Sequence, residues 1–145
     1  MRILASIKPL TTSLPKSPYD GFFECVSFQC EGSLDSLAPT THFDIKDATL
    51  VHPLDAVSTD LLDACVAGTK LEINVLYEQT GASGTFIYLK VNLSQATIVR
   101  INHRGVAGGS AVPVEALALS PSAVNGTFYD AGGKELGRTS FNRCP

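Results

Sequence analysis

The stretch covering residues 55–102 constrains the fold most, because it predicts one short helix that leads directly into a long β-hairpin. Ser58 or Thr59 can act as the N-cap, since a side-chain hydroxyl accepts a hydrogen bond from the amides that a first helical turn leaves unpaired. Gly68 supplies the left-handed position that ends a helix without a steric penalty. The sequence therefore predicts a helix over about residues 58–67, which is too short to persist alone in water and needs a sheet to pack against.

The predicted helix has an apolar side and an acidic side. The apolar side, expected to be buried, consists of Leu61, Leu62, Cys65 and Val66. Asp60 and Asp63 lie on the other side and are expected to face solvent. Asp55, just before the helix, can accept hydrogen bonds from the helix N-terminal amides or pair with a neighbouring chain.

Alternating apolar and polar residues predict the two strands of the hairpin. In the first strand, the residues expected to be buried are Leu71, Ile73, Val75 and Tyr77. Residues 79–84 have the composition of a hairpin turn, and residues 85–93 return as the second strand. One face of this second strand is apolar, and the other is amphipathic and consists of Phe86, Tyr88, Lys90 and Asn92.

The remainder of the chain predicts more strands and no further helix. Strands are expected at residues 2–10, 22–29, 42–51, 96–102, 112–119 and 124–129, with a bulge or bend at Asp47. Loops are expected at residues 11–21, 32–41 and 104–113, a turn at 131–134, and the tail from residue 138 fits no single element. About eight strands without strand–helix alternation predict a mainly β fold, an antiparallel β-barrel or two-sheet sandwich with the helix at its side.

The length and charge of the chain bound its organisation and exclude some partners. At 145 residues, the chain is expected to form a single domain, residues 1–145. A net charge of −3 and scattered basic residues argue against nucleic-acid binding. No apolar run approaches the roughly 18 residues of a membrane span, and Lys8 and Pro9 interrupt the apolar start, so neither membrane insertion nor a signal peptide is expected. If the protein leaves the cell, it does so by another route.

The residues that most often carry chemistry do not form a recognisable constellation. The four cysteines, expected to be reduced thiols, are Cys25, Cys30, Cys65 and Cys144, with Cys144 the accessible one. They form no CxxC pair, and His42, His52 and His103 are isolated from one another, so no metal site or cofactor is predicted. No GxSxG elbow is present, and no catalytic residue is predicted. We therefore expect a protein that is not an enzyme.

The order of these features resembles the haemolysin-coregulated proteins, the Hcp family that forms the inner tube of the bacterial type VI secretion system. The resemblance rests on the run from Ala48 to Asp55, the helix from Val57 to Gly68, and the hairpin from Leu71 to Leu93. It continues through a strand at 96–102, a glycine-containing loop, and the Glu-containing strand at 114–119.

This resemblance implies a β-barrel that assembles head-to-tail into hexameric rings, which stack into a tube. It implies the type VI sheath, spike and effector proteins as partners, assembly in the bacterial cytoplasm, and export by the type VI machine without a signal peptide. The amphipathic strand face would border either a neighbouring subunit or the lumen. The loops at 11–21, 104–113 and 32–41 are candidates for stacking. The candidate subunit or stacking contacts are Pro15, Lys16, Tyr19, Asp20, Asp55, Asp60, Asp63, Arg104, Gly105, Gly108 and Gly109.

The chain also departs from the family pattern. The family commonly has Lys where His52 stands and Pro where Thr59 stands, and Pro121 interrupts what is usually a continuing strand. These departures indicate a divergent member. The strand count also permits an alternative function, a monomeric small β-barrel that binds a ligand or a protein in an enclosed apolar pocket. A hydrolase on the same barrel would need convergent polar residues that the sequence does not suggest.

Overall fold

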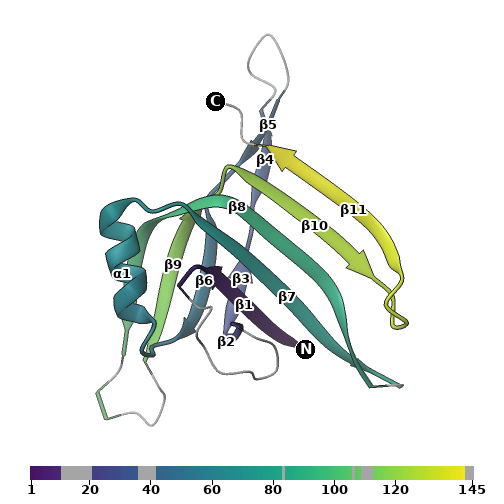
Figure 1. The fold of residues 1–145 in the computed structure, drawn as a ribbon, viewed down its shortest axis with the longest axis horizontal. Coiled ribbons are helices and arrows are strands. Elements are labelled where there is room, and N and C mark those ends of the chain that lie inside the picture. The colour runs from purple at the N-terminus through teal and green to yellow at the C-terminus, as the bar shows by residue number, and fades with distance from the viewer. Residues whose placement is uncertain (11–20, 36–41, 83, 106, 109–112, 143–145) are drawn as a thin grey trace.

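A computed structural model describes residues 1–10, 21–35, 42–82, 84–105, 107–108 and 113–142 of the chain (Figure 1). These residues form eleven strands and one helix. The elements are β1 (Arg2–Lys8), β2 (Phe23–Cys25), β3 (Ser27–Gln29), β4 (Gly32–Asp35), β5 (His42–Ile45), β6 (Ala48–Pro53), α1 (Ser58–Ala67), β7 (Leu71–Gly81), β8 (Gly84–Arg104), β9 (Val114–Ser120), β10 (Ala123–Tyr129) and β11 (Glu135–Asn142). The fold is mainly antiparallel β with a single short helix, as predicted.

The main sheet curls into a small barrel. Its strand order is β2-β1-β7-β8-β9-β6-β3, and every pairing along this path is antiparallel. The two ends of the path are neighbours in sequence, joined by Val26, whose amide donates to the carbonyl of Val51 at 2.8 Å. The sheet is thereby closed on itself. Strands β10 and β11 continue outward from the first half of β8, while β4 and β5 form a separate hairpin.

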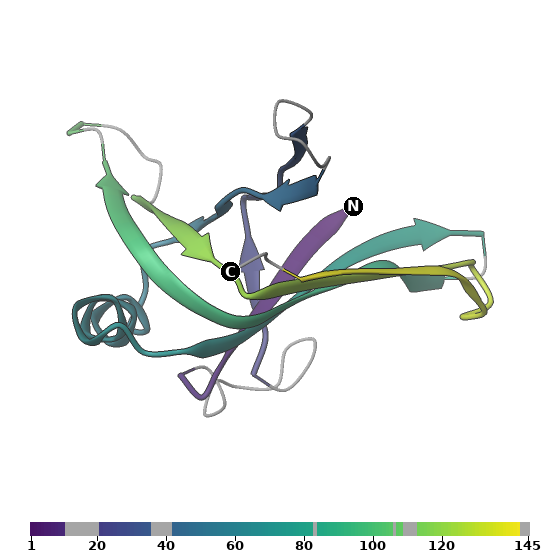
Figure 2. The same ribbon diagram turned by 90° about the horizontal axis from the view of Figure 1, so that it is seen from above.

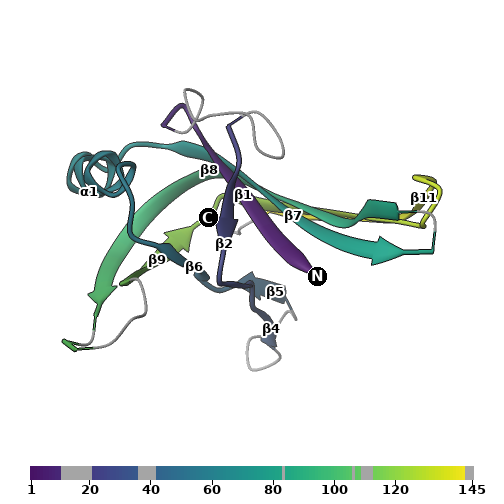
Figure 3. The same cartoon turned by 90° about the horizontal axis from the view of Figure 1, so that it is seen from below.

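Strand β8 belongs to two parts of the molecule. Its first half lies between β7 and β10, and its second half pairs with β9. The change occurs beside Gln95, which has a positive φ of 48°. The prediction of two separate strands, at 85–93 and 96–102, is therefore wrong, because one strand of 21 residues bends here instead of ending. Figures 2 and 3 show β7, β8, β10 and β11 extending together away from the barrel.

Three other predicted segments differ from the structure. The strand expected at 22–29 is two strands, because the chain changes pairing partner at Val26, from β1 to β6. Part of the loop expected at 32–41 is strand β4, which pairs with β5 through backbone hydrogen bonds that composition does not reveal. The strand expected at 42–51 breaks at Lys46 and Asp47, close to the predicted bend. The ambiguous tail contains most of β11, which pairs with β10.

The core fills the barrel and the space beneath α1. The fully buried large side chains include Leu4, Ile7, Leu50, Leu61, Leu71, Ile73, Val75, Leu93, Leu117 and Leu119. Leu71, Ile73 and Val75 are buried as their alternation predicts. The core therefore joins β1, β6, β7, β8, β9 and α1 into one cluster.

The helix has the predicted boundaries but a different rotation. Leu61 is completely buried, with Ser58 and Ala64 on the same side. Leu62 and Val66 are exposed by 48% and 83%, so their predicted burial is wrong. The small side chains Ser58 and Ala64 form the buried side with Leu61, and this side turns the two larger apolar residues outward. Asp60 and Asp63 are exposed, as predicted.

Gly68 ends α1 in the left-handed conformation, with φ of 66°. A Cβ at this position would meet no atom within 4 Å, so only the backbone restricts the residue type. Replacing Gly68 by alanine is expected to lower the free energy of unfolding by about 1–2 kcal/mol. Gly137→Ala is the control, because it has the same open space without a positive φ. Urea denaturation of both variants measures the difference, and an equal loss would contradict the backbone explanation.

No helix in the part of the chain that the structure describes has the length and apolar character needed to cross a membrane.

Candidate functional site

The first group of candidate residues lies where the chain enters α1. The Asp55 carboxylate accepts a hydrogen bond from the Val57 amide at 3.0 Å, and the Ser58 hydroxyl accepts one from the Asp55 amide at 3.3 Å. Val57 is the N-cap residue and makes no side-chain cap, so the predicted N-cap at Ser58 or Thr59 is wrong. The Thr59 hydroxyl instead donates to the Ala56 carbonyl. Of the two roles predicted for Asp55, the structure contains the hydrogen bond to a helix N-terminal amide.

The second group lies at the β8–β9 connection. Arg104, Gly105 and Gly108 are exposed at this end of the barrel. The Leu54 amide donates to the Pro113 carbonyl at 2.8 Å, which ties the entry of α1 to the end of this connection. The structure therefore brings Asp55 and the base of the predicted loop to one region. Pro15, Lys16, Tyr19, Asp20 and Gly109 lie outside the described residues, so their predicted contacts stay predictions.

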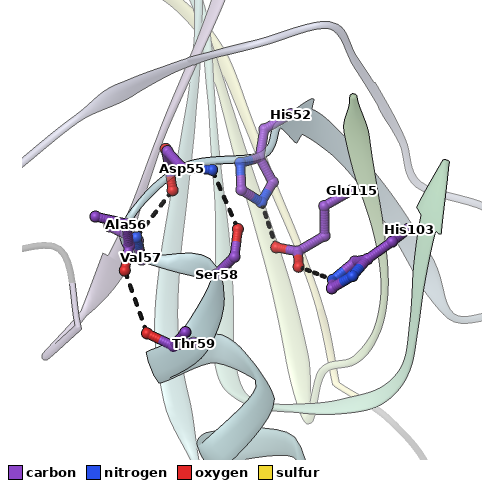
Figure 4. A network of polar contacts seen from close by, with 8 residues as sticks. All are labelled: His52, Asp55, Ala56, Val57, Ser58, Thr59, His103 and Glu115. Atoms are coloured by element: carbon purple, nitrogen blue, oxygen red, sulfur yellow. Dashed lines mark hydrogen bonds and ion pairs between the residues drawn. The ribbon is translucent and has the colours of Figure 1, made fainter. Parts of the chain in front are cut away.

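A buried polar cluster lies next to these residues and was not predicted (Figure 4). The Glu115 carboxylate is completely buried on β9 and accepts hydrogen bonds from two histidines on the flanking strands. His52 Nε2 on β6 donates to Glu115 Oε1 at 2.7 Å, and His103 Nε2 on β8 donates to Oε2 at 2.5 Å. The two histidines thus share one carboxylate, although the sequence separates them.

The two histidines differ in their access to water. The His52 side chain is 1% exposed and packs against the Phe23 ring, with 5.1 Å between the ring centroids. Its Nδ1 atom is buried and has no hydrogen-bond partner among the described residues. The His103 side chain is 47% exposed. One sequence signal could have identified the cluster: Glu115 shares a strand face with the buried Leu117 and Leu119, where a carboxylate needs partners.

A second polar arrangement crosses the hairpin and β10–β11. Asn92 on β8 donates through Nδ2 to Glu72 Oε1 at 2.8 Å and to Asn74 Oδ1 at 2.9 Å. Asn92 Oδ1 accepts from Asn125 Nδ2 at 3.2 Å, and Asn125 Oδ1 accepts from the Ser140 hydroxyl at 2.6 Å. We call these five residues, Glu72, Asn74, Asn92, Asn125 and Ser140, the polar ladder. It extends the predicted amphipathic face of Asn92 across four strands.

The described cysteines are free thiols, as predicted, but they differ in exposure. Burial raises the pKa of Cys25 to about 12, with smaller contributions from the charges of Glu24 and Asp55. Burial also raises the pKa of Cys30, but this residue is exposed, so the prediction that Cys144 is the accessible thiol is wrong for Cys30. Cys144 lies outside the described residues, so its predicted accessibility is not tested. No group of three or more His, Cys, Asp or Glu side chains in the described ranges is arranged to hold a metal ion.

The raised pKa of Cys25 predicts a stability change in alkali. The unfolded thiol loses its proton above about pH 9, whereas the folded thiol keeps it until about pH 12, so unfolding becomes more favourable as pH rises across this range. Replacing Cys25 by alanine is expected to make the loss of stability between pH 9 and 10 shallower, by at most about 1 kcal/mol. Urea denaturation at the two pH values checks this, and an unchanged pH dependence would contradict it.

The fold matches solved structures of one group of bacterial proteins. The chain superimposes on Hcp1 from Salmonella typhimurium with a TM-score of 0.76 and 16% identity, covering 97% of this chain and 93% of that one. For a type VI secretion system effector from Yersinia pestis, the TM-score is 0.75 at 14% identity, with 97% and 98% covered. For the secreted protein Hcp3 from Pseudomonas aeruginosa, it is 0.75 at 18% identity, with 99% of both chains covered. The chain therefore has the fold of these solved structures.

The sequence supports the same relationship. Residues 23–128 match the family model described as the type VI secretion system effector Hcp. Because this match covers most of the chain, the protein belongs to the Hcp family, and the resemblance found in the sequence is confirmed. A comparison with curated proteins found no match. The family makes the chain a type VI secretion tube or effector protein, and a monomeric ligand-binding barrel is not favoured.

Proposed function

We propose that the protein is the tube subunit of a type VI secretion system and that residues 1–145 form one tube domain. Six copies form a ring, the rings stack into a tube, and the tube carries or chaperones effectors. The observation that carries the proposal is the family match over residues 23–128. In this role the protein is structural rather than enzymatic. It assembles in the bacterial cytoplasm, contacts the sheath, spike and effectors, and is exported by its own machine.

The distribution of exposed apolar side chains supports a head-to-tail ring. Such a ring needs two different surfaces on each subunit, because the front of one copy contacts the back of the next. Helix α1 and the β10–β11 hairpin lie at opposite ends of the molecule (Figure 1). Leu62 and Val66 are exposed at the first end, and Phe128, Leu136 and Phe141 are exposed on the hairpin. We propose that these two ends form the subunit contact, with Asp60 and Asp63 at its margin.

The polar surfaces have other roles in this proposal. The predicted stacking contacts, Asp55, Arg104, Gly105 and Gly108, lie at the end where the chain enters α1 and leaves β8, and they reach toward the next ring. The polar ladder faces the lumen, because a row of polar side chains suits a wall along which cargo moves through water. The predicted contacts outside the described residues, Pro15, Lys16, Tyr19, Asp20 and Gly109, belong to the loops nominated for the same stacking role.

Sedimentation velocity and negative-stain microscopy of the purified protein test this function together. The expected result is a hexamer by mass and a ring with a central hole, with stacks at high protein concentration. A species that remains a monomer at all concentrations and shows no rings would overturn the proposal. That result would restore the monomeric binding barrel as the leading function.

A further inference from the structure

A cavity of about 440 Å³ lies beside the polar ladder, and neither the family match nor the tube proposal gives it a ligand. Its wall is formed by Phe22, Asn74, Leu76, Ile87, Lys90, Val91, Asn92, Asn125 and Thr127. The volume is within the range of small-molecule sites, roughly 300–1,000 Å³. Apolar side chains form part of the wall, and three asparagines, one threonine and one lysine form the remainder.

The orientation of the asparagine amides follows from Glu72. An ionised carboxylate can only accept hydrogen bonds, so the Asn92 group at 2.8 Å from Glu72 Oε1 must be its NH₂. Asn92 Oδ1 then faces Asn125, which must present its own NH₂ to it. The same Asn92 NH₂ also contacts Asn74, which must present its oxygen. Each amide orientation is thus set by its neighbour along the polar ladder.

These hydrogen bonds occupy the acceptor atom of Asn92 and leave N–H donors of Asn74 and Asn125 without a partner among the described residues. Asn92 has both N–H groups and both acceptor positions of Oδ1 engaged, the latter by Asn125 and Ser94. Asn74 Nδ2 keeps two N–H groups, and Asn125 Nδ2 keeps one, for which no acceptor is recorded among the described residues. The Thr127 hydroxyl likewise has no recorded partner in the described part of the chain. The polar wall of the cavity is therefore rich in unused donors.

The charge in the wall also favours a ligand that accepts hydrogen bonds. Of the described wall residues, only Lys90 is charged, and its ammonium lies 5.2 Å from the centroid of the Tyr129 ring. The Glu72 side chain is not part of the wall, and its Oε1 accepts a hydrogen bond from Asn92. Charge-assisted hydrogen bonds from amide and ammonium donors to a carboxylate are stronger than those to a neutral acceptor.

We propose that this cavity binds a carboxylate that stands beside an apolar group, as at the C-terminus of a peptide with an apolar last residue or at an acidic side chain with an apolar neighbour. Asn74, Asn125 and Lys90 donate to the carboxylate oxygens. Phe22, Leu76 and Ile87 contact the apolar group. The site lies within one subunit, so the proposal does not depend on ring formation.

Saturation-transfer NMR with three probes tests the proposed ligand and works for a monomer or a ring. The probes are N-acetyl-leucine, its neutral analogue N-acetyl-leucinamide, and acetyl-Leu-Asp-NH₂, which carries its carboxylate on a side chain. At least one of the acidic probes is expected to bind with a dissociation constant at least about fivefold lower than that of the neutral amide. The acidic probe that binds identifies the source of the carboxylate. Equal binding of all three probes, or no binding by either acid, would overturn the proposal.

Asn74→Asp is the matching variant, because it keeps the size and the acceptor for Asn92 but removes both free donors and adds a negative charge. It is expected to weaken binding of the acidic probe at least tenfold. Asn102→Asp is its control, since it makes the same chemical change on an exposed position outside the cavity. An Asn74→Asp protein that binds as tightly as the Asn102→Asp protein would overturn the proposal. Sedimentation velocity on the same samples reports ring formation separately.

Discussion

Replacing Leu61 by aspartate is expected to unfold the protein. Leu61 is completely buried beneath α1 and belongs to the core cluster that also contains Ala64, Ala96 and Ile98. Loss of the leucine contacts and burial of an unpaired charge together cost about 5 kcal/mol or more, which equals or exceeds the net stability of many domains of this size. Circular dichroism of the purified variant and its yield of soluble protein measure the effect.

Leu62→Asp provides the matched control, because it makes the same chemical change one residue further along the helix. Leu62 is 48% exposed, so its aspartate can reach water, and the free energy of unfolding should change by less than about 1 kcal/mol. The two variants should therefore separate folding from assembly: Leu61→Asp loses the fold, whereas Leu62→Asp keeps the fold and weakens the proposed ring. A Leu61→Asp protein that stayed folded would contradict the burial of Leu61, and a Leu62→Asp protein that assembled normally would contradict the proposed ring contact.

This pair also shows what the sequence could and could not predict about the helix. Gly68 and the length of the apolar pattern defined where α1 ends, because these are local properties of the chain. The rotation of the helix depends on its neighbours, and the small residues Ser58 and Ala64 lie on the buried side with Leu61. A pattern of apolar side chains cannot distinguish Leu61 from Leu62 when the sheet beneath is unknown.

The same limit applies to β8. The alternation predicted the buried Leu71, Ile73 and Val75, because a regular strand has a period of two, but it was wrong for Tyr77, which is only partly buried beside a register shift in the β7–β8 pairing. The predicted strands ended at residue 93 and began again at residue 96, whereas the chain bends there and exchanges the partners β7 and β10 for β9. Only the three-dimensional arrangement shows that the hydrogen bonds continue. The polar ladder could not be predicted in full for this reason, since Ser140 reaches Asn125 only through the pairing of β11 with β10.

The Glu115 cluster illustrates a second limit, which is strand register. His52 pairs with Glu115 across 63 residues of sequence, and His103 pairs with it across 12. Each histidine lies directly opposite Glu115 in its strand pair. The histidines look isolated in the sequence, because no local pattern states which residues will face each other. The buried position of Glu115 on a leucine-rich strand was the one local indication.

Replacing Glu115 by alanine is expected to lower the free energy of unfolding by about 3–5 kcal/mol, because it leaves the buried His52 ring without an acceptor for its Nε2–H. His52 cannot recover this hydrogen bond from water, since its side chain is only 1% exposed and its Nδ1 already has no partner among the described residues. Urea denaturation of the wild type and the variant at one pH measures the loss.

His103→Ala is the control for this prediction. It removes the other hydrogen bond to the same carboxylate, but the His103 side chain is 47% exposed and water can replace its Nε2–H, so a loss of about 1 kcal/mol or less is expected. The decisive result is the difference between the two losses in free energy of unfolding, because this difference depends on burial and not on the number of hydrogen bonds. Equally small losses would mean that water reaches both sides of Glu115, and equally large losses would mean that it reaches neither. In the first case the carboxylate would be a surface group, and the cluster would contribute little to joining β6, β8 and β9 near the proposed stacking end; the second would contradict the predicted role of burial.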